Sequence, residues 1–166
     1  MHAKLSIFGI MSLLLFSCNT AKLKEEQNEQ KKISKWIVGK YLFMDEGAGV
    51  YYEEWTKNDS VNYNGNGFYL TGDAVDTLFS MHMKLILQKD KTVLIYDVKE
   101  SGKMKELEFF LTSKENSNYV FENPVHDFPS ILQYKFLPDS TIEVTQRGFI
   151  ENKEKVRDYK IRKINQ

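Results

Sequence analysis

From residue 40 onward, the sequence is a series of short runs rich in β-branched and aromatic residues, with turn residues between them. The runs recur about every 8 to 15 residues, which is the spacing of an all-β domain. No long amphipathic helix interrupts the series. Strands that follow one another through short turns predict an up-and-down antiparallel β-barrel, because closure leaves no exposed sheet edge. We expect about ten strands, at residues 40–44, 50–56, 60–70, 76–88, 92–98, 106–113, 118–122, 131–137, 141–148 and 155–164.

Several of these runs alternate between apolar and polar residues. Leu132, Tyr134 and Phe136 are apolar or aromatic, and the residues between them are polar. Such alternation predicts strands with one face toward a core and the other toward water. The eleven Phe, nine Tyr and two Trp can fill that core, because aromatic side chains bury large areas.

The N-terminus has the features of an export signal. A Lys at position 4 precedes an apolar stretch over residues 5–16, which is shorter than the roughly 20 residues that span a bilayer. The small residue Ser17 then precedes Cys18, the single cysteine of the chain. This pattern is a lipobox and predicts cleavage after Ser17 and acylation of Cys18. The alternatives are an ordinary signal peptide with an incidental Cys, or a buried N-terminal helix.

These features divide the chain into three parts. Residues 1–17 are the predicted lipoprotein signal peptide, residues 18–32 the lipidated Cys18 with a polar tether, and residues 33–166 the barrel domain. Residues 33–39 form an apolar turn or short helix at its entry. We expect a monomer in the cell envelope, anchored by lipid to a bacterial membrane, the outer membrane being favoured, on its periplasmic or surface side.

The charge balance argues against a nucleic-acid partner. The chain has 23 Lys and Arg against 23 Asp and Glu, without a long basic cluster. Nucleic-acid-binding domains instead carry a basic patch or stripe.

The predicted strand at 50–56 carries the first candidate site. Alternation places Tyr51, Glu53 and Trp55 on one face. If Trp55 points inward, Glu53 is buried too, and a buried carboxylate must be paired or protonated. We expect Arg147 or His126 as its partner. Alternatively, Trp55 lies on the outer face or at a barrel end and Glu53 is solvated.

The second candidate site is the run FENPVHDFP at residues 121–129. Its two prolines end a strand and stiffen a loop that displays Glu122, Asn123, His126 and Asp127. Three interpretations remain open: these polar groups bond the loop backbone and close a barrel mouth, they bind a ligand, or they take part in catalysis. The sequence contains no second His nearby at zinc-ligand spacing.

His82 lies between Met81 and Met83, a combination that can bind copper or haem. The two methionines alternate with His82 and therefore face the opposite side of a strand. An ordinary strand residue is the favoured interpretation, and we expect neither a metal nor a cofactor in this protein.

The run at 121–129, followed by Ile131 and Tyr134, resembles the signature of a family of small bacterial proteins of unknown function. Many members are Bacteroidota lipoproteins with a lipocalin-like barrel, and the resemblance covers roughly residues 34–164. It implies that fold and an envelope location. The family's acid before the Trp falls on Glu53, and its signature polar residues fall on Glu122, Asn123, His126 and Asp127. The chain departs from the family at Met81, where relatives often have Glu, and at Ser130, where a basic residue is common. Weaker landmarks are Trp36, Gly39, Glu53 to Trp55, Phe110 to Ser113 and Gly148.

The function expected from these features is non-catalytic binding of a small apolar or amphipathic ligand inside the barrel. One alternative is a hydrolase-like enzyme that uses Glu53 and His126 as acid and base. Another is a structural or partner-binding envelope lipoprotein whose barrel is filled. The candidate ligand-binding residues are Glu53, Trp55, Glu122, Asn123, His126, Asp127, Tyr134 and Arg147.

Overall fold

The structure, a computed structural model, describes Asn28 and residues 31–45, 49–70, 77–88, 91–100 and 103–164. The predicted signal peptide, Cys18 and most of the tether lie outside the described residues. The described residues form ten strands where ten were predicted, with their ends displaced by a few residues at most. Within the described ranges, no helix is long and apolar enough to cross a membrane. The strands are β1 (Gly39–Asp45), β2 (Gly49–Lys57), β3 (Asn62–Leu70), β4 (Thr77–Leu87), β5 (Thr92–Glu100), β6 (Lys103–Glu115), β7 (Asn118–Glu122), β8 (Ile131–Phe136), β9 (Thr141–Ile150) and β10 (Lys153–Ile164).

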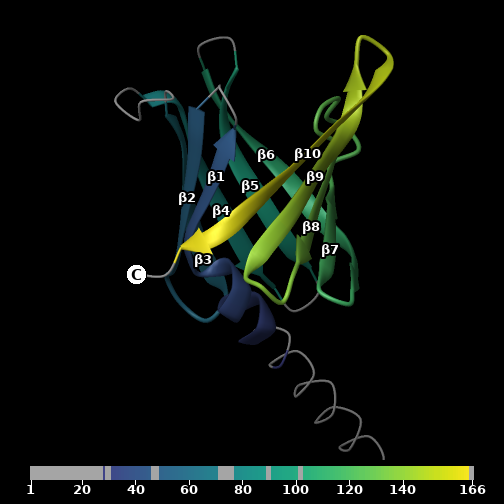
Figure 1. Ribbon diagram of the computed structural model, residues 1–166. Coiled ribbons are helices and arrows are strands. Elements are labelled where there is room, and N and C mark those ends of the chain that lie inside the picture. The colour runs from purple at the N-terminus through teal and green to yellow at the C-terminus, as the bar shows by residue number, and fades with distance from the viewer. Residues whose placement is uncertain are drawn as a thin grey trace, which may run out of the picture.

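The strands form a closed antiparallel barrel in which each strand pairs with its neighbours in sequence (Figure 1). Closure comes from the pairing of β1 with β10, where Lys40 lies opposite Ile164. The predicted up-and-down barrel is therefore confirmed. We call the end of the barrel near the N-terminal helix the helix end, and the end where β1 finishes and β2 begins the opposite end.

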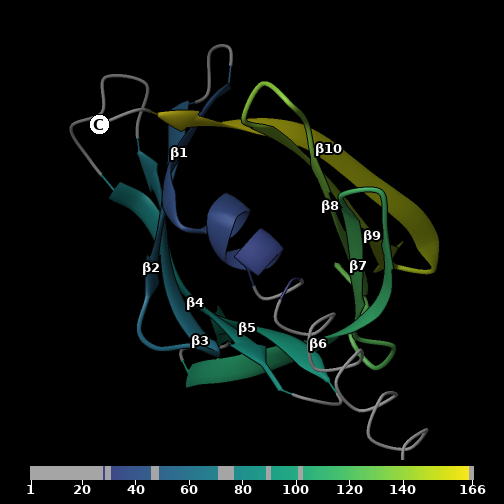
Figure 2. The ribbon, with the colours of Figure 1, turned by 90° about the horizontal axis from the view of Figure 1, so that it is seen from below.

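A short helix at residues 31–37 closes the helix end. Seen from below in Figure 2, it lies inside the ring of strands. The spacing of Ile33, Trp36 and Ile37 puts all three on one face, and both isoleucines are buried in the core. Each contributes roughly 1.5–3 kcal/mol of hydrophobic stabilisation. The Lys163 ammonium donates a hydrogen bond to the carbonyl of Val38 (2.6 Å) and so caps the C-terminal end of the helix.

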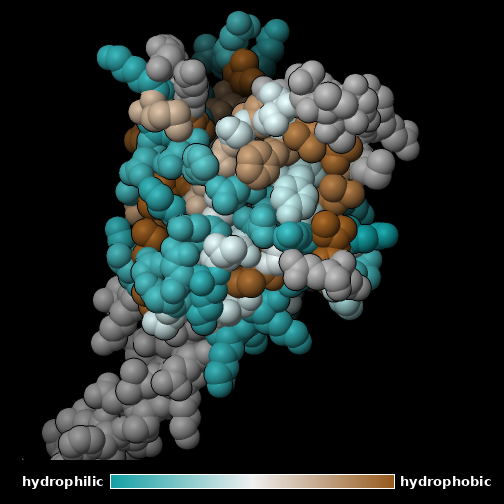
Figure 3. Space-filling view, turned by 90° about the vertical axis from the view of Figure 1, so that its left-hand side faces the viewer, coloured by the Kyte–Doolittle hydropathy of each residue, from teal (hydrophilic) through white to brown (hydrophobic). Residues whose placement is uncertain are grey.

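The two faces of the barrel wall differ as the alternation predicts. The inner face holds an apolar core, with Leu85, Phe109, Leu132 and Ile161 almost fully inaccessible to water. On the side of the barrel shown in Figure 3, hydrophilic residues predominate and hydrophobic ones are scattered among them. The described chain therefore forms its apolar core inside the barrel without a disulfide.

Candidate functional site

Strand β2 directs Tyr51, Glu53 and Trp55 into the barrel. Their exposed fractions are 8%, 7% and 4%, whereas Glu54 between them is partly exposed. The prediction that Glu53 is carried inside together with Trp55 is confirmed. The alternative, with Trp55 outside and Glu53 solvated, is wrong.

The partners of Glu53 differ from those expected. The Tyr51 hydroxyl donates a hydrogen bond to Oε2 (2.7 Å), and the Trp55 indole N–H donates one to Oε1. Arg147 lies opposite Ile131 on the outer face and is exposed, so the expected pairing of Arg147 with Glu53 is wrong. His126 bonds to its own loop and, within the described residues, is not among the hydrogen-bond partners of Glu53. Two neighbours on the same strand therefore supply the hydrogen-bond donors to Glu53.

The environment of Glu53 favours its neutral form. Burial raises the pKa of Glu53 above its ordinary value, and hydrogen bonds from Trp55 and Tyr51 offset only part of this rise. Within the described residues, Glu53 forms no ion pair that would stabilise its charge. A neutral carboxyl group can donate a hydrogen bond as well as accept one.

Glu53 belongs to a layer of polar groups across the barrel interior. The hydroxyl groups of Tyr96 and Tyr134 are hydrogen-bonded to each other, and Gln146 donates to the hydroxyl of Tyr159 (3.4 Å). Burial, followed by the charge of neighbouring tyrosines and of Glu53, raises the pKa of these phenols. They therefore remain neutral hydrogen-bonding groups at physiological pH. We call the following set the tyrosine layer: Tyr51, Glu53, Tyr96, Tyr134 and Tyr159.

Two glycines of β3, which were not among the predicted site residues, make room for this layer. Gly65 lies opposite Trp55, and a Cβ atom there would approach the indole ring to 2.7 Å. A Cβ atom at Gly67 would lie 2.7 Å from the Tyr51 hydroxyl oxygen. The available signal was the pair of glycines at alternate positions of one strand, which indicates close approach by another group.

The space on the two sides of the tyrosine layer differs. Toward the helix end, a cavity of about 20 Å³ touches Glu53, Trp55 and Trp36, which is room for about one water molecule. Toward the opposite end, inward-facing side chains stay partly exposed, so water reaches them. These side chains are Phe43, Tyr69, Met81 and Val98.

The polar side chains of the signature loop form hydrogen bonds with main-chain groups of the loop itself. The side-chain oxygen of Asn123 accepts a hydrogen bond from the main-chain amide of Val125 (3.2 Å). The main-chain amide of Asn123 donates a hydrogen bond to the carbonyl of Ser130 (2.8 Å). Nδ1 of His126 is 2.9 Å from the carbonyl oxygen of Pro129. Among the interpretations left open for the loop, these contacts favour the backbone-bonding one.

Strand β9 holds the loop in place. The amide of Phe149 donates a hydrogen bond to the carbonyl of Asp127 (2.7 Å), whose side chain is exposed. A Cβ atom at Gly148 would lie 2.1 Å from that same carbonyl oxygen, so only glycine allows the loop to lie this close. Glu122 lies opposite Phe110 and Ile131 and faces outward. Of the eight candidate residues, the structure therefore brings three together in the interior: Glu53, Trp55 and Tyr134.

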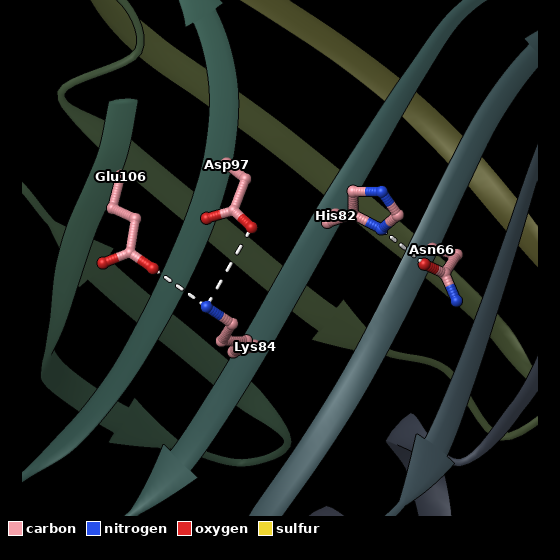
Figure 4. A network of polar contacts seen from close by, with 5 residues as sticks. All are labelled: Asn66, His82, Lys84, Asp97 and Glu106. Carbon is pink, nitrogen blue, oxygen red and sulfur yellow. Dashed lines mark hydrogen bonds and ion pairs between the residues drawn. The ribbon is translucent and has the colours of Figure 1, made fainter. Parts of the chain in front are cut away.

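His82 belongs to a polar network on the outside of the barrel (Figure 4). Its Nδ1 lies 2.7 Å from the side-chain oxygen of Asn66. Close by, the Lys84 ammonium bonds Glu106 at 2.8 Å and lies 4.0 Å from Asp97. Exposed pairs of this kind contribute roughly 0–1 kcal/mol each. The described residues contain no group of three His, Cys, Asp or Glu side chains that could hold a metal ion.

Comparison of the chain with protein-family models, with curated proteins and with solved structures found no match. The resemblance to the lipoprotein family therefore stays a prediction from the signature residues.

Proposed function

We propose that this protein is a lipid-anchored envelope protein that binds a small amphipathic molecule, without catalysis, in the part of its barrel beyond the tyrosine layer. The observation that carries the proposal is the exposure of inward-facing side chains such as Tyr69 and Met81. Both side chains are partly exposed, whereas Phe109 deeper in the barrel is fully buried. Their accessibility leaves apolar walls on which an apolar body can lie.

The tyrosine layer forms the polar floor of this proposed site. Neutral hydroxyl groups both donate and accept hydrogen bonds, and a neutral Glu53 does the same. Such a floor suits the uncharged polar end of an amphipathic molecule. It does not suit a cation, because a neutral Glu53 gives the floor no negative charge to attract one. The cavity below the layer is too small for anything but water.

Two alternatives have less support. Acid–base catalysis by Glu53 and His126 requires both groups to reach one substrate, yet Nδ1 of His126 is engaged with Pro129 and both Glu53 oxygens accept hydrogen bonds. A wholly filled barrel has less support, because the inward-facing side chains beyond the tyrosine layer stay partly exposed.

The binding proposal is tested with N-phenyl-1-naphthylamine, a neutral fluorescent probe. Met81 faces inward opposite Gly67, whereas the next residue, His82, is exposed on the outer face. Met81→Trp should therefore abolish probe binding, and the matched control His82→Trp should retain it. Equal binding to both variants, or no binding to the unaltered protein, would refute the interior site.

Anchoring is tested separately. Incorporation of radiolabelled fatty acid should be lost in Cys18→Ser, because the predicted acylated thiol is absent. Equal labelling of the two forms would disprove the anchor while leaving the interior site untouched.

A further inference from the structure

A groove lies beside the helix at the end of the barrel away from the proposed interior site. Its volume is about 510 Å³, within the range of pockets that hold small ligands. The helix at residues 31–37 forms one side, and the β6–β7 and β8–β9 turns form the other. Nothing in the proposed interior site accounts for this second space.

The floor of the groove is aromatic. Trp36 of the helix stacks on Phe136 with ring centroids 3.7 Å apart, and Tyr119 meets the edge of Phe136 at 5.6 Å. Leu137 and Pro138 continue the apolar surface. A surface built in this way suits a flat or extended apolar body.

The charged residues of the groove have one sign. Lys32, Lys35 and Lys163 line it, and no Asp or Glu is among its lining residues in the described chain. The nearest acid in the β8–β9 turn is Asp139, whose carboxylate accepts a hydrogen bond from the amide of Thr141 (3.1 Å) and does not line the groove. Since the ammonium groups of Lys35 and Lys163 stand beside an apolar floor that no acid of the described chain lines, the groove complements an anion attached to an apolar chain.

The Lys163 ammonium is held in position. It donates hydrogen bonds to the carbonyl of Val38 (2.6 Å) and, more weakly, to that of Lys35 (3.5 Å). Lys35 itself lies on the exposed side of the helix. One ammonium is therefore preorganised, and the other can reach a ligand by a rotamer change.

We propose that this groove binds a free amphiphile whose polar end is an anion such as a carboxylate. The anion lies between the ammonium groups of Lys35 and Lys163, and the apolar chain lies along Trp36 and Phe136. This site does not depend on the interior site, because it lies at the other end of the barrel and selects charge.

The experiment is a titration of the full-length protein with dodecanoate, followed by NMR. The chain has two tryptophans, so the indole N–H signals of Trp36 and Trp55 are separate reporters. Dodecanoate should shift the Trp36 signal more than the Trp55 signal. Dodecanol, which has the same chain without the charge, should bind about tenfold more weakly.

A matched pair of charge reversals locates the anion. Lys35→Glu should weaken dodecanoate binding about tenfold. Lys57→Glu makes the same change at the same end of the barrel but outside the groove, and it should leave binding within about twofold. Both residues are exposed, so thermal melts should show both variants folded.

The proposal is overturned if dodecanoate leaves the Trp36 signal in place, if dodecanol binds equally well, or if the two reversals behave alike. It is also overturned if dodecanoate does not bind while vesicles of phosphatidylglycerol bind in a Lys35-dependent way, because the helix end would then contact a membrane surface. None of these outcomes bears on N-phenyl-1-naphthylamine binding at the other end.

Discussion

The triplet on β2 and the signature loop both concentrate polar and aromatic residues in a few positions, yet the structure uses them differently. On β2, Tyr51 and Trp55 direct their donors at the Glu53 carboxyl inside the barrel. In the loop, Asn123 and His126 bond main-chain groups of the loop itself. The difference teaches that a cluster of polar and aromatic side chains can form a site only where those side chains are not used as hydrogen-bond partners of the main chain.

The physical reason is the supply of backbone partners. The main-chain groups of β2 are paired in the ladders with β1 and β3, so its side chains are available for the interior. The loop at residues 123–130 has no such ladder along most of its length and contains two prolines, which lack an N–H. Buried main-chain groups must find partners, and short polar side chains supply them.

The largest effect is expected at Trp55. Trp55→Ala removes a buried indole and one donor to Glu53, and it should lower the free energy of unfolding by about 3–5 kcal/mol. Urea unfolding measures this loss. The adjacent exposed residue provides a control, since Thr56→Ala should change stability by no more than about 0.5 kcal/mol. A loss below about 1 kcal/mol for Trp55→Ala would mean that the triplet is not part of the core.

A smaller effect is expected where the loop meets β9. Gly148→Ala places a Cβ atom against the carbonyl of Asp127, so the loop must shift at a cost of about 1–3 kcal/mol. Arg147→Ala, next to it on the outer face, should stay within about 0.5 kcal/mol. If Gly148→Ala unfolds at the same urea concentration as the unaltered protein, the loop is not packed against β9.

The next effect, in the stability of Glu53→Gln, depends on pH. Because burial raises the pKa of Glu53 from its ordinary value of 4.5, ionisation favours the unfolded chain, and stability is lost as pH rises through and above that value. Near pH 4 the variant should lie within about 1 kcal/mol of the unaltered protein, since Gln resembles a neutral carboxyl group. From pH 4 to 8, the variant should gain stability relative to the unaltered protein.

The control for this series is Glu54→Gln, whose side chain is on the outer face. Its effect should remain within about 0.5 kcal/mol at every pH. If Glu53→Gln instead became less stable than the unaltered protein as pH rises, Glu53 would be an ionised carboxylate that its surroundings stabilise. That result would contradict the neutral form that burial favours.

The smallest effect is expected at Asp127, whose side chain is exposed. Asp127→Asn should change stability by less than about 0.5 kcal/mol and leave N-phenyl-1-naphthylamine binding unchanged. If this variant lost the probe while Met81→Trp retained it, the loop and not the interior would be the functional region.

The strands were predictable because their signals are local. Turn residues between β-type runs located all ten strands, and alternation such as that of Leu132, Tyr134 and Phe136 identified the inner face of several of them. The same alternation placed Glu53 inside with Trp55. Sequential hairpins then left an up-and-down barrel as the simplest way to remove both edges.

The partners of Glu53 and the tyrosine layer required the tertiary structure. Tyr96, Tyr134 and Tyr159 come from β5, β8 and β10, and their meeting depends on the register around the whole barrel, which no local pattern contains. The same holds for the groove, where a helix before the first strand meets the β8–β9 turn. Periodicity specifies which way a side chain points, whereas barrel closure decides what it meets, because residues far apart in sequence become neighbours only when β1 pairs with β10.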